Sequence, residues 1–248
     1  MKSVTSDLNI FDHLEELRKR LIVSLISVGA LSVLSFFSSD VLIKLIVAPA
    51  MRYIYSLYFF SPYEAFMTKI KVSIVTGLVL SLPVIFYQLW LFVSPGLYPK
   101  EKKLVLPLVI ISSVLFLIGV LFSYYLVIPF ALSFFLNFQT GTLAPLISIG
   151  SYLSFFLSLV LIFGFLFDIP VVLIGLIVLG VIKTEFLKAQ RKITIVAIFI
   201  LAAVLTPTVD LFTQCVLAVA LWMLFEFSIW VGAQIEKKEK LNQSKAAL

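Results

Sequence analysis

Cysteine, histidine and charged residues are scarce in this 248-residue chain, and the first two shortages exclude particular kinds of site. The one cysteine, Cys215, lies in an apolar run, so no disulfide can form within the chain. The one histidine, His13, lies outside the apolar runs, and no metal site of the usual histidine and cysteine kind is expected. The motifs HExxH, GxSxG, CxxC and the P-loop are absent. We therefore expect neither an enzyme of those classes nor a bound cofactor.

Charged residues make up only 13% of the chain, whereas hydrophobic residues make up 62% and phenylalanine alone occurs 24 times. Soluble domains carry about a quarter charged residues. One globule of this size cannot bury so much apolar surface, so the composition predicts an integral membrane protein. The net charge of +6 does not indicate nucleic-acid binding, because the basic residues lie between apolar runs rather than along one polar face.

Six apolar runs are candidates for membrane-crossing helices, which need about 20 mostly apolar residues each. The runs cover residues 21–38, 70–94, 104–131, 152–180, 193–206 and 211–232. We predict an all-α fold with a single membrane domain over residues 1–235, which includes an amphipathic segment at 8–20. The polar tail at 236–248 is predicted to be disordered. Six crossings would place both termini on the same side of the membrane.

The basic residues are distributed unevenly between the two sides of this predicted topology. Of the 19 basic residues, only Lys44, Arg52, Lys69 and Lys71 fall on the side opposite the termini. Positively charged loop residues stay in the cytoplasm. We therefore predict a multi-pass protein of the inner membrane, with both termini and the loops at 95–103 and 183–192 in the cytoplasm.

Two features of the apolar runs predict the shape of the bundle. The apolar stretch Ile193–Leu205 spans roughly 20 Å as a helix, short of a hydrocarbon core of about 30 Å. Prolines 83, 107, 129 and 170 lie within or near the ends of the other runs, and an interior proline tends to bend a helix. We expect a curved, cup-like bundle with a short hairpin formed by the fifth and sixth helices.

The sequence Ser61-Pro62-Tyr63-Glu64 has the pattern of a helix start, with an N-cap serine, a proline at the first position and a glutamate at the third. The second helix is therefore expected to begin outside the membrane. The preceding segment 39–60, which contains Pro49, is expected to be an outer loop with short amphipathic pieces.

Two acid–base pairs precede the first apolar run, with Glu15 four residues before Lys19 and Glu16 four residues before Arg20. Their simplest interpretation is a self-neutralised helix surface, in which each pair contributes a few tenths of a kcal/mol. The alternative is that a carboxylate is presented at the membrane surface to a basic partner. The stretch alone favours the simpler interpretation.

Two further acids lie in unusual surroundings. Glu101 is the only acid in a basic loop held by two prolines, and it either balances local charge or forms half of a site for a cationic ligand. Asp168 lies well inside the fourth run, beside Pro170, where an ionisable group costs on the order of 3 kcal/mol. Its side chain either satisfies backbone freed by Pro170 or faces a wet cavity.

The last run and the turn before it carry three more polar candidates. Glu226 and Gln214 lie within the run, and polar side chains in lipid commonly join neighbouring helices. We expect Glu226 to contact a neighbour, within the chain or from a partner. Asp210, at the turn between the last two runs, is expected to cap the last helix.

Several ordered motifs together resemble the TatC family, the polytopic subunit of the twin-arginine protein translocase. The first is HLEELRKR at residues 13–20, and the second is SPYEAF at 61–66. The most specific is PVIFYQLWLFVSPGLY at 83–98, which includes Gln88 and is followed by Glu101. The sequences FDIP at 167–170 and Phe225-Glu226 add to the resemblance, which extends over about residues 10–232.

The resemblance implies a receptor that binds signal peptides with two consecutive arginines on folded cargo proteins. It implies partnership with the single-span proteins TatA and TatB, driven by the proton-motive force, and a homo-oligomer within the translocase. Carried over onto this sequence, Glu16 and Glu101 would bind the arginines, with Arg18 and Phe92 beside them. The resemblance thus reverses the simpler interpretation of Glu16.

Other positions also take roles from the resemblance. Thr206, Gln214 and Asp210 would lie where the partner helices dock, and Gln88, Asp168 and Glu226 would be functional polar groups near or in the membrane. Pro49, Ser61, Pro62 and Glu64 would build the outer loop. The family has glutamate where this chain has Asp168.

Three rival functions make different demands on the sequence. A secondary solute transporter would show an internal repeat and a midplane site, and no repeat is present. An intramembrane hydrolase needs a partner for Asp168 that the apolar runs do not supply. A purely structural scaffold would tolerate loss of Glu16 and Glu101.

Overall fold

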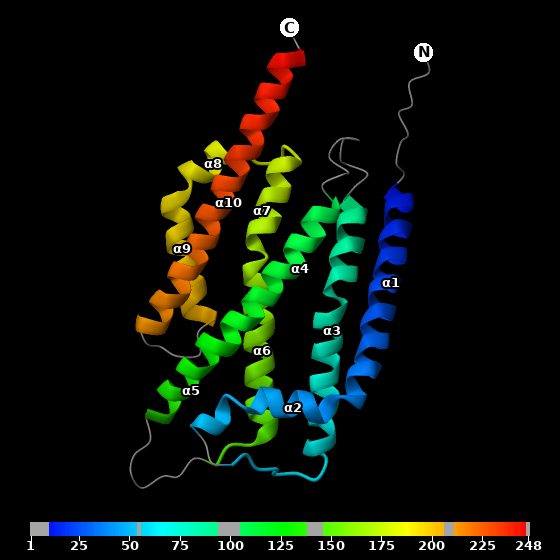
Figure 1. Cartoon of the computed structure of the whole chain (residues 1–248), viewed down its shortest axis with the longest axis vertical. Helices are drawn as coiled ribbons and strands as arrows, with labels where there is room; N and C mark the ends of the chain where they lie inside the picture. Colours follow the sequence, from blue (N-terminus) through cyan, green and yellow to red (C-terminus); the bar gives the residue numbers. More distant parts are fainter. Residues whose placement is uncertain (1–9, 54–55, 94–104, 138–145, 206–210, 247–248) are drawn as a thin grey trace.

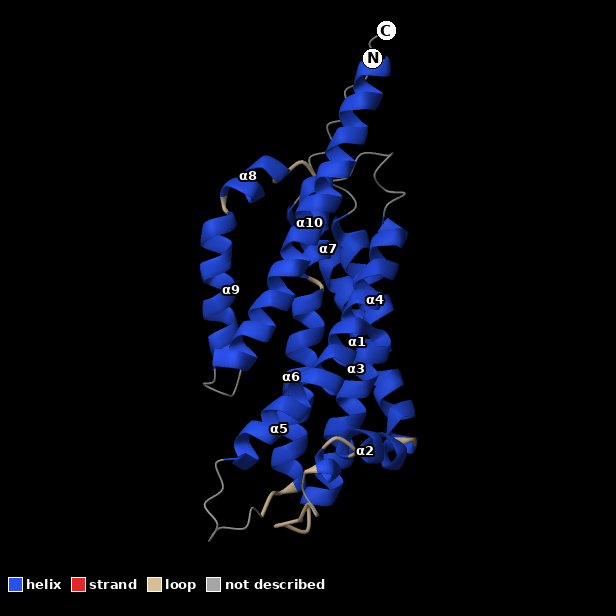
Figure 2. Ribbon diagram, turned by 60° about the vertical axis from the view of Figure 1, so that its left-hand side comes forward, coloured by secondary structure: helices blue, strands red, loops and turns tan. Residues whose placement is uncertain are grey.

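The protein is helical almost throughout in a computed structural model that describes residues 10–53, 56–93, 105–137, 146–205 and 211–246 (Figures 1 and 2). The helices are α1 (Ile10–Phe37), α2 (Ser39–Val47), α3 (Glu64–Val93), α4 (Val105–Phe122), α5 (Ile128–Asn137), α6 (Ile149–Phe167), α7 (Ile169–Val178), α8 (Thr184–Ala189), α9 (Arg191–Leu205) and α10 (Leu211–Ala246). Within these ranges, the β structure consists of an isolated bridge between Tyr58 and Ser148. The predicted all-α class is confirmed.

Five helical stretches in the described residues are long and apolar enough to cross a membrane. They are His13–Phe37, Glu64–Val93, Val105–Asn137, Ile149–Val178 and Leu217–Lys237, and each overlaps a predicted run. The remaining predicted run corresponds to α9, which has 15 residues, about 22 Å of helix. These helices are consistent with a multi-pass membrane protein, while a sixth crossing by α9 and the cup shape stay predictions.

The first and last helices differ from the predicted segment boundaries. The amphipathic segment at 8–20 and the first run form one unbroken helix from Ile10. The tail predicted to be disordered after residue 235 is instead a continuation of α10 to Ala246. That prediction is wrong because residues 236–246 contain neither glycine nor proline and are rich in helix formers such as lysine, glutamate, leucine and alanine.

The start of α1 and the end of α10 lie at the same end of the molecule (Figure 1). We call this end, where α3 also finishes and α8 lies, the termini face. At the opposite face α3 and α6 begin, and α2 lies across the bundle (Figure 1).

Two of the prolines accompany breaks in the long runs, and a third lies inside an unbroken helix. Between α4 and α5 the chain widens into a π turn at Ser123–Val127, directly before Pro129, whose missing N–H removes a hydrogen bond inside that turn. Pro170 lies in the first turn of α7, after the break at Asp168. Pro83 lies inside α3, which continues through it as a helix.

Small residues allow the long helices to approach closely. A side chain at Gly77 of α3 would collide with Ser32 of α1, and one at Gly164 of α6 would collide with the ring of Phe116 of α4. Gly119 of α4 meets the backbone of α6 in the same way. Small residues at helix–helix interfaces are typical of membrane bundles, where packing replaces the hydrophobic effect.

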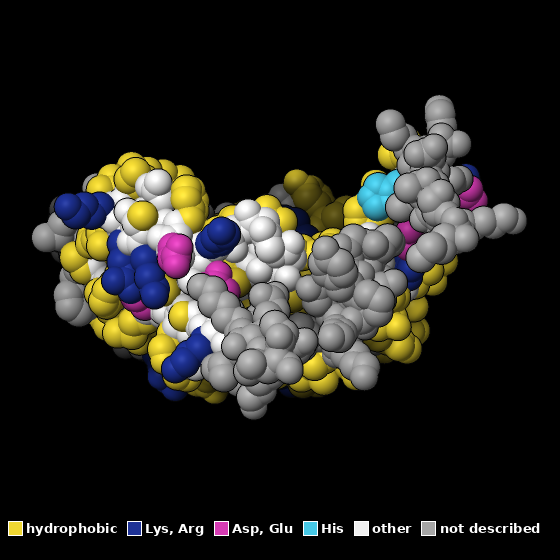
Figure 3. All heavy atoms as spheres, turned by 90° about the horizontal axis from the view of Figure 1, so that it is seen from above, with side chains coloured by type: hydrophobic (Ala, Val, Ile, Leu, Met, Phe, Trp, Pro, Cys, Tyr) yellow, Lys and Arg dark blue, Asp and Glu magenta, His cyan; other side chains and the backbone are white. Residues whose placement is uncertain are grey.

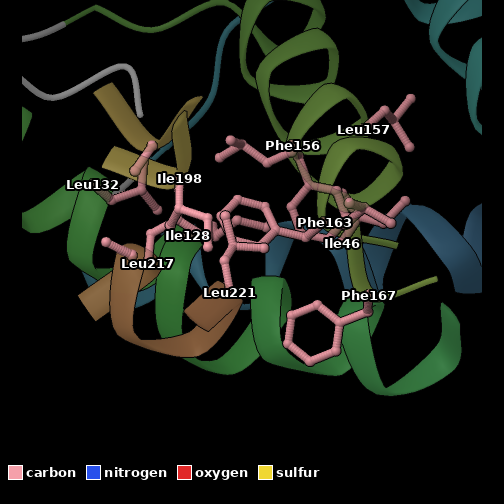
Figure 4. Packing of buried hydrophobic residues seen from close by; sticks show 14 of the residues in the cluster. Ile46, Ile128, Leu132, Phe156, Leu157, Phe163, Phe167, Ile198, Leu217 and Leu221 are labelled. Carbon is pink, nitrogen blue, oxygen red and sulfur yellow. The ribbon is translucent and has the colours of Figure 1, made fainter. Parts of the chain in front are cut away.

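The main core joins elements that are far apart in the sequence. Phe163 of α6 and Ile128 of α5 are fully buried, and Leu217 of α10 and Ile198 of α9 pack in the same cluster (Figure 4). A second cluster gathers around Trp90 of α3, with residues of α4 and α7. The second cluster fixes the end of α3 at the termini face.

The helix α2 is fastened to the bundle by two tyrosines. Tyr124 donates a hydrogen bond to the carbonyl of Leu45 at 3.0 Å, and Tyr152 donates to the carbonyl of Ile46 at 2.8 Å. Both carbonyls belong to the last turn of α2. Backbone carbonyls in the last turn of a helix have no N–H group further along the helix to bond to. The helix α2 lies within segment 39–60, where the sequence predicts short amphipathic pieces.

Candidate functional site

A hollow of about 540 Å³ opens at the termini face between α1 and α3. It is lined by Glu15, Glu16, Lys19, Arg20, Val23 and Gln88. In the view onto this face, the single histidine marks the same edge of the molecule, with acidic and basic side chains beside it (Figure 3). A hollow lined by charged groups of both signs and by an amide is suited to a polar or ionic ligand.

Helical spacing pairs the charged groups along α1. Lys19 lies 2.9 Å from Glu15, and Arg20 lies 2.9 Å from Glu16, so both predicted pairs are confirmed. The two pairs differ in exposure, because the Glu15 side chain is 61% exposed and the Glu16 side chain 32%. Of the two adjacent carboxylates, Glu16 is therefore the one turned toward the bundle.

A residue on α3 completes the pairing around Glu16. The Arg20 guanidinium donates one hydrogen bond to Glu16 at 2.9 Å and a second to the Gln88 side-chain oxygen at 3.0 Å. Gln88 follows Arg20 by 68 residues in the chain. The fork geometry of the guanidinium thus holds one carboxylate of α1 against α3.

Two aromatic contacts hold the end of α3 against its neighbouring helices. The rings of His13 on α1 and Phe92 on α3 are stacked, with centroids 4.3 Å apart and an angle of 22° between planes. Two residues before Phe92, the Trp90 ring packs against Gly175 of α7, where a side chain would collide with it. The end of α3 is thereby fixed between α1 and α7.

Of the other residues predicted for signal-peptide binding, the structure describes Phe92 and Arg18 but not Glu101. Phe92 stacks on His13 and is not among the residues that line the hollow. Arg18 is exposed on α1 and is not among the residues that line the hollow. Glu101 lies outside the described residues, in the segment that follows α3.

Asp168 is buried at the break between α6 and α7, with 6% of its surface exposed. Neither carboxylate oxygen has a hydrogen-bond partner, and its side chain does not cap α7. The interpretation in which Asp168 satisfies the backbone freed by Pro170 is therefore wrong. The break relies on backbone bonds alone, such as that from the Val171 N–H to the Asp168 carbonyl at 3.0 Å.

The polar groups of the last run join α9 to α10, as expected for Glu226. Arg191 at the start of α9 lies 2.7 Å from Glu226 of α10, and Gln214 of α10 donates to the Phe199 carbonyl of α9 at 3.1 Å. Thr206 and Asp210, the other predicted docking residues, lie outside the described residues.

The outer-loop residues meet at the opposite face. Glu64 accepts hydrogen bonds from the Phe60 and Gly150 N–H groups, each at 2.8 Å, and from the Ser148 hydroxyl. Ser61 opens the turn into α3, because its carbonyl accepts from the Glu64 N–H at 3.0 Å. Pro62 follows it in that turn, and Pro49 precedes a single 3₁₀ turn at Ala50–Arg52.

Several of these contacts were not predicted from the sequence. No local pattern in the sequence indicates the bond between Gln88 and Arg20, that between Arg191 and Glu226, or those from Ser148 and Gly150 to Glu64. The two residues of each bond lie more than 30 positions apart in the chain. Among the described residues, no three His, Cys, Asp or Glu side chains are gathered where they could hold a metal ion.

The fold and this hollow define a class: a multi-pass α-helical membrane protein with an ionic site at one face of the bundle. The family model for the Sec-independent protein translocase protein TatC matches residues 12–219. The chain belongs to the TatC family, so it is a component of a protein translocase rather than a classical enzyme.

Named relatives and solved structures agree with the family. The TatC protein of Carboxydothermus hydrogenoformans is 37% identical over 96% of this chain and 98% of its own length. That of Desulforapulum autotrophicum is 41% identical over 95% of this chain and 88% of its own. A crystal structure described as the twin arginine translocase receptor TatC is 39% identical, with a TM-score of 0.74 over 90% of this chain and 98% of that one.

Proposed function

We propose that this chain is the signal-peptide receptor of a twin-arginine translocase and binds the paired arginines of folded precursor proteins at the termini face. The observation that carries the proposal is the half-buried Glu16 carboxylate in the hollow between α1 and α3, already holding a guanidinium at 2.9 Å. A carboxylate that accepts one hydrogen bond from a guanidinium has further lone pairs that can accept from a second one. The description of the similar crystal structures as a receptor supports the same function.

The chemistry of arginine fits two separated carboxylates. A guanidinium forms bidentate, charge-assisted hydrogen bonds to a carboxylate, and a lysine ammonium cannot reproduce the fork. Glu16 takes one arginine and Glu101 takes the other, with Arg18 and Phe92 flanking the peptide. Phe92 supports this arrangement because its stacking on His13 brings the end of α3 to the start of α1.

The remaining parts of the proposal concern orientation and assembly. The termini face is cytoplasmic in the inner membrane, α9 is the sixth crossing, and copies of the chain associate within the translocase. TatA- and TatB-type helices dock near Thr206, Asp210 and Gln214, and the proton-motive force drives transport. The short α9 thins the bilayer locally, because the helix spans less than the usual hydrocarbon core.

A binding assay tests the receptor function. A twin-arginine peptide is titrated into the detergent-purified protein and its Glu16→Gln and Glu101→Gln variants, with each peptide arginine also replaced by lysine. Each change is expected to weaken binding by at least about tenfold, because a charge-assisted hydrogen bond contributes roughly 1.5 to 3 kcal/mol.

Two matched variants control for charge alone. Glu185→Gln removes an exposed carboxylate of α8, far from the hollow along the chain, and should leave peptide affinity unchanged. Glu15→Gln removes the exposed neighbour of Glu16 and should have a smaller effect than Glu16→Gln. Equal losses from all of these variants, or no loss from either Glu16→Gln or Glu101→Gln, would contradict the proposal.

A further inference from the structure

A second hollow, of about 430 Å³, lies at the opposite face between the beginnings of α3 and α6. The lining residues that matter for its chemistry are Tyr63, Glu64, Thr68, Lys71, Ser148 and Ser154. The peptide site proposed above is at the other end of the molecule and does not involve these residues.

One end of this hollow carries a fixed negative charge. The Glu64 carboxylate is held by the N–H groups of Phe60 and Gly150 and by the Ser148 hydroxyl. A side chain at position 150 would collide with the carboxylate, so a glycine there is what allows the close approach. Three donors from two segments leave the carboxylate little freedom to turn away.

The other end carries a positive charge with spare donors. Lys71 donates to the Ser154 hydroxyl at 3.2 Å, which uses one of the three protons of its ammonium group. Glu64, Thr68 and Lys71 follow one another at helical spacing and so lie on one face of α3. The hollow therefore presents a carboxylate and an ammonium on the same helix face.

Between the two charges lies a hydroxyl without a partner. Thr68 is 3% exposed, and its hydroxyl has no hydrogen-bond partner. A buried polar group without a partner is costly, and most such groups in proteins are satisfied. Thr68 belongs to the wall of the hollow, but its hydroxyl oxygen is itself enclosed, so the contacts open to a ligand are those of Lys71, Ser154 and Glu64.

The surroundings of the hollow indicate the kind of ligand. Phe59, Phe60, Tyr63 and Phe66 are each more than half exposed, and exposed aromatic side chains gather at membrane–water interfaces. The exposed stripe continues along α3 through Met67 and Ile74 into the apolar span. A molecule with a polar head in the hollow would have its apolar part on this stripe.

We propose that the hollow binds the headgroup of a zwitterionic phospholipid of the phosphoethanolamine class. The phosphate lies at Lys71 and Ser154, and the ammonium lies at Glu64. A headgroup with only negative charge meets the Glu64 carboxylate, which disfavours it. A choline headgroup has no N–H to donate to that carboxylate. The assignment does not depend on the receptor function proposed above.

Native mass spectrometry of the full-length protein in a mild detergent tests the assignment. Phosphatidylethanolamine, phosphatidylcholine and phosphatidylglycerol with identical acyl chains are offered at equal concentration. Phosphatidylethanolamine is expected to be retained in preference to both others. Lys71→Gln should lower its affinity about tenfold, the factor that corresponds to losing one hydrogen bond to a charged group.

The matched control is Lys44→Gln, which removes a basic charge from α2 at the same face but outside the hollow, and it should leave occupancy unchanged. Equal losses of bound lipid from Lys44→Gln and Lys71→Gln would show that the lipid is held only by general electrostatic attraction to basic residues, and would overturn the proposal. The proposal would also be overturned if the wild-type protein retained phosphatidylglycerol or phosphatidylcholine as strongly as phosphatidylethanolamine. This comparison uses the wild-type protein alone, so it does not depend on whether a variant folds. Soluble glycerophosphoethanolamine should compete weakly, and competition equal to the lipid would overturn the lipid assignment.

Discussion

Glycines decide how closely the helices of this protein approach one another. Because Gly77 has no side chain, the backbone of α1 at Ser32 can pack directly against it, and the indole ring of Trp90 packs against Gly175 for the same reason. In contrast, Gly29 of α1 has no atom of another element within 4 Å of where a side chain would begin. The same residue type is therefore required at some positions and dispensable at another.

Gly175→Ala should destabilise the protein by about 1 to 3 kcal/mol, because the added methyl group overpacks the Trp90 ring. The measurement is the thermal unfolding midpoint in detergent. Gly29→Ala is the matched control, and it should be neutral or slightly stabilising, because alanine favours a helix over glycine by about 1 kcal/mol. Equal midpoints for the two variants would show that Trp90 does not fix the end of α3.

Polar contacts hold the ends of several helices. The C-terminal turn of α2 is bound by the hydroxyls of Tyr124 and Tyr152. The start of α9 is bound to α10 by Arg191 and Glu226, and the start of α8 is bound by Glu236, which accepts from the Thr184 N–H at 2.9 Å. Helix ends have unpaired backbone groups, so these are the places where a polar side chain stabilises most.

Tyr152→Phe should lower stability by about 1 to 3 kcal/mol, because it leaves the buried Ile46 carbonyl without this donor. Tyr124→Phe removes the same kind of bond at a more exposed position, where water can replace it, and should cost less. Thermal unfolding gives both values, and amide hydrogen exchange in α2 should increase with Tyr152→Phe. A larger loss of stability from Tyr124→Phe than from Tyr152→Phe would show that Tyr124, and not Tyr152, is the main contact that holds α2 to the bundle.

At the scale of the whole molecule, charge and length set the orientation in the bilayer. The termini face carries Arg18, Lys19 and Arg20 on α1 and the basic residues of α8 and α9. The described basic residues at the opposite face are Lys44, Arg52, Lys69 and Lys71. An excess of basic residues on one side predicts that this side is cytoplasmic.

Cysteine labelling tests this orientation in intact cells. In a Cys215→Ser background, Lys44→Cys on α2 and Glu185→Cys on α8 introduce exposed thiols at opposite faces. A membrane-impermeant maleimide should label position 44 in intact cells and position 185 only after permeabilisation. The reverse pattern would place the termini face outside the cytoplasm and would contradict a cytoplasmic site for the signal peptide.

The sequence alone determined the features that depend on local spacing. Apolar runs of sufficient length predicted the long helices, the i, i+4 spacing predicted both ion pairs on α1, and ordered motifs predicted the family. The error at the C-terminal tail came from treating polarity as disorder where helix propensity prevails. These properties are encoded in neighbouring residues, so no knowledge of the packing was needed.

Only the tertiary structure decided which distant polar groups meet. Gln88 reaches Arg20, Gly150 reaches Glu64, and Glu226 reaches Arg191 across separations of 68, 86 and 35 residues. The same packing left Asp168 and Thr68 buried without hydrogen-bond partners. A polar residue in an apolar run shows that some contact is needed, but its partner depends on which helix faces pack together, and that choice is made by small residues and side-chain shape across the whole bundle.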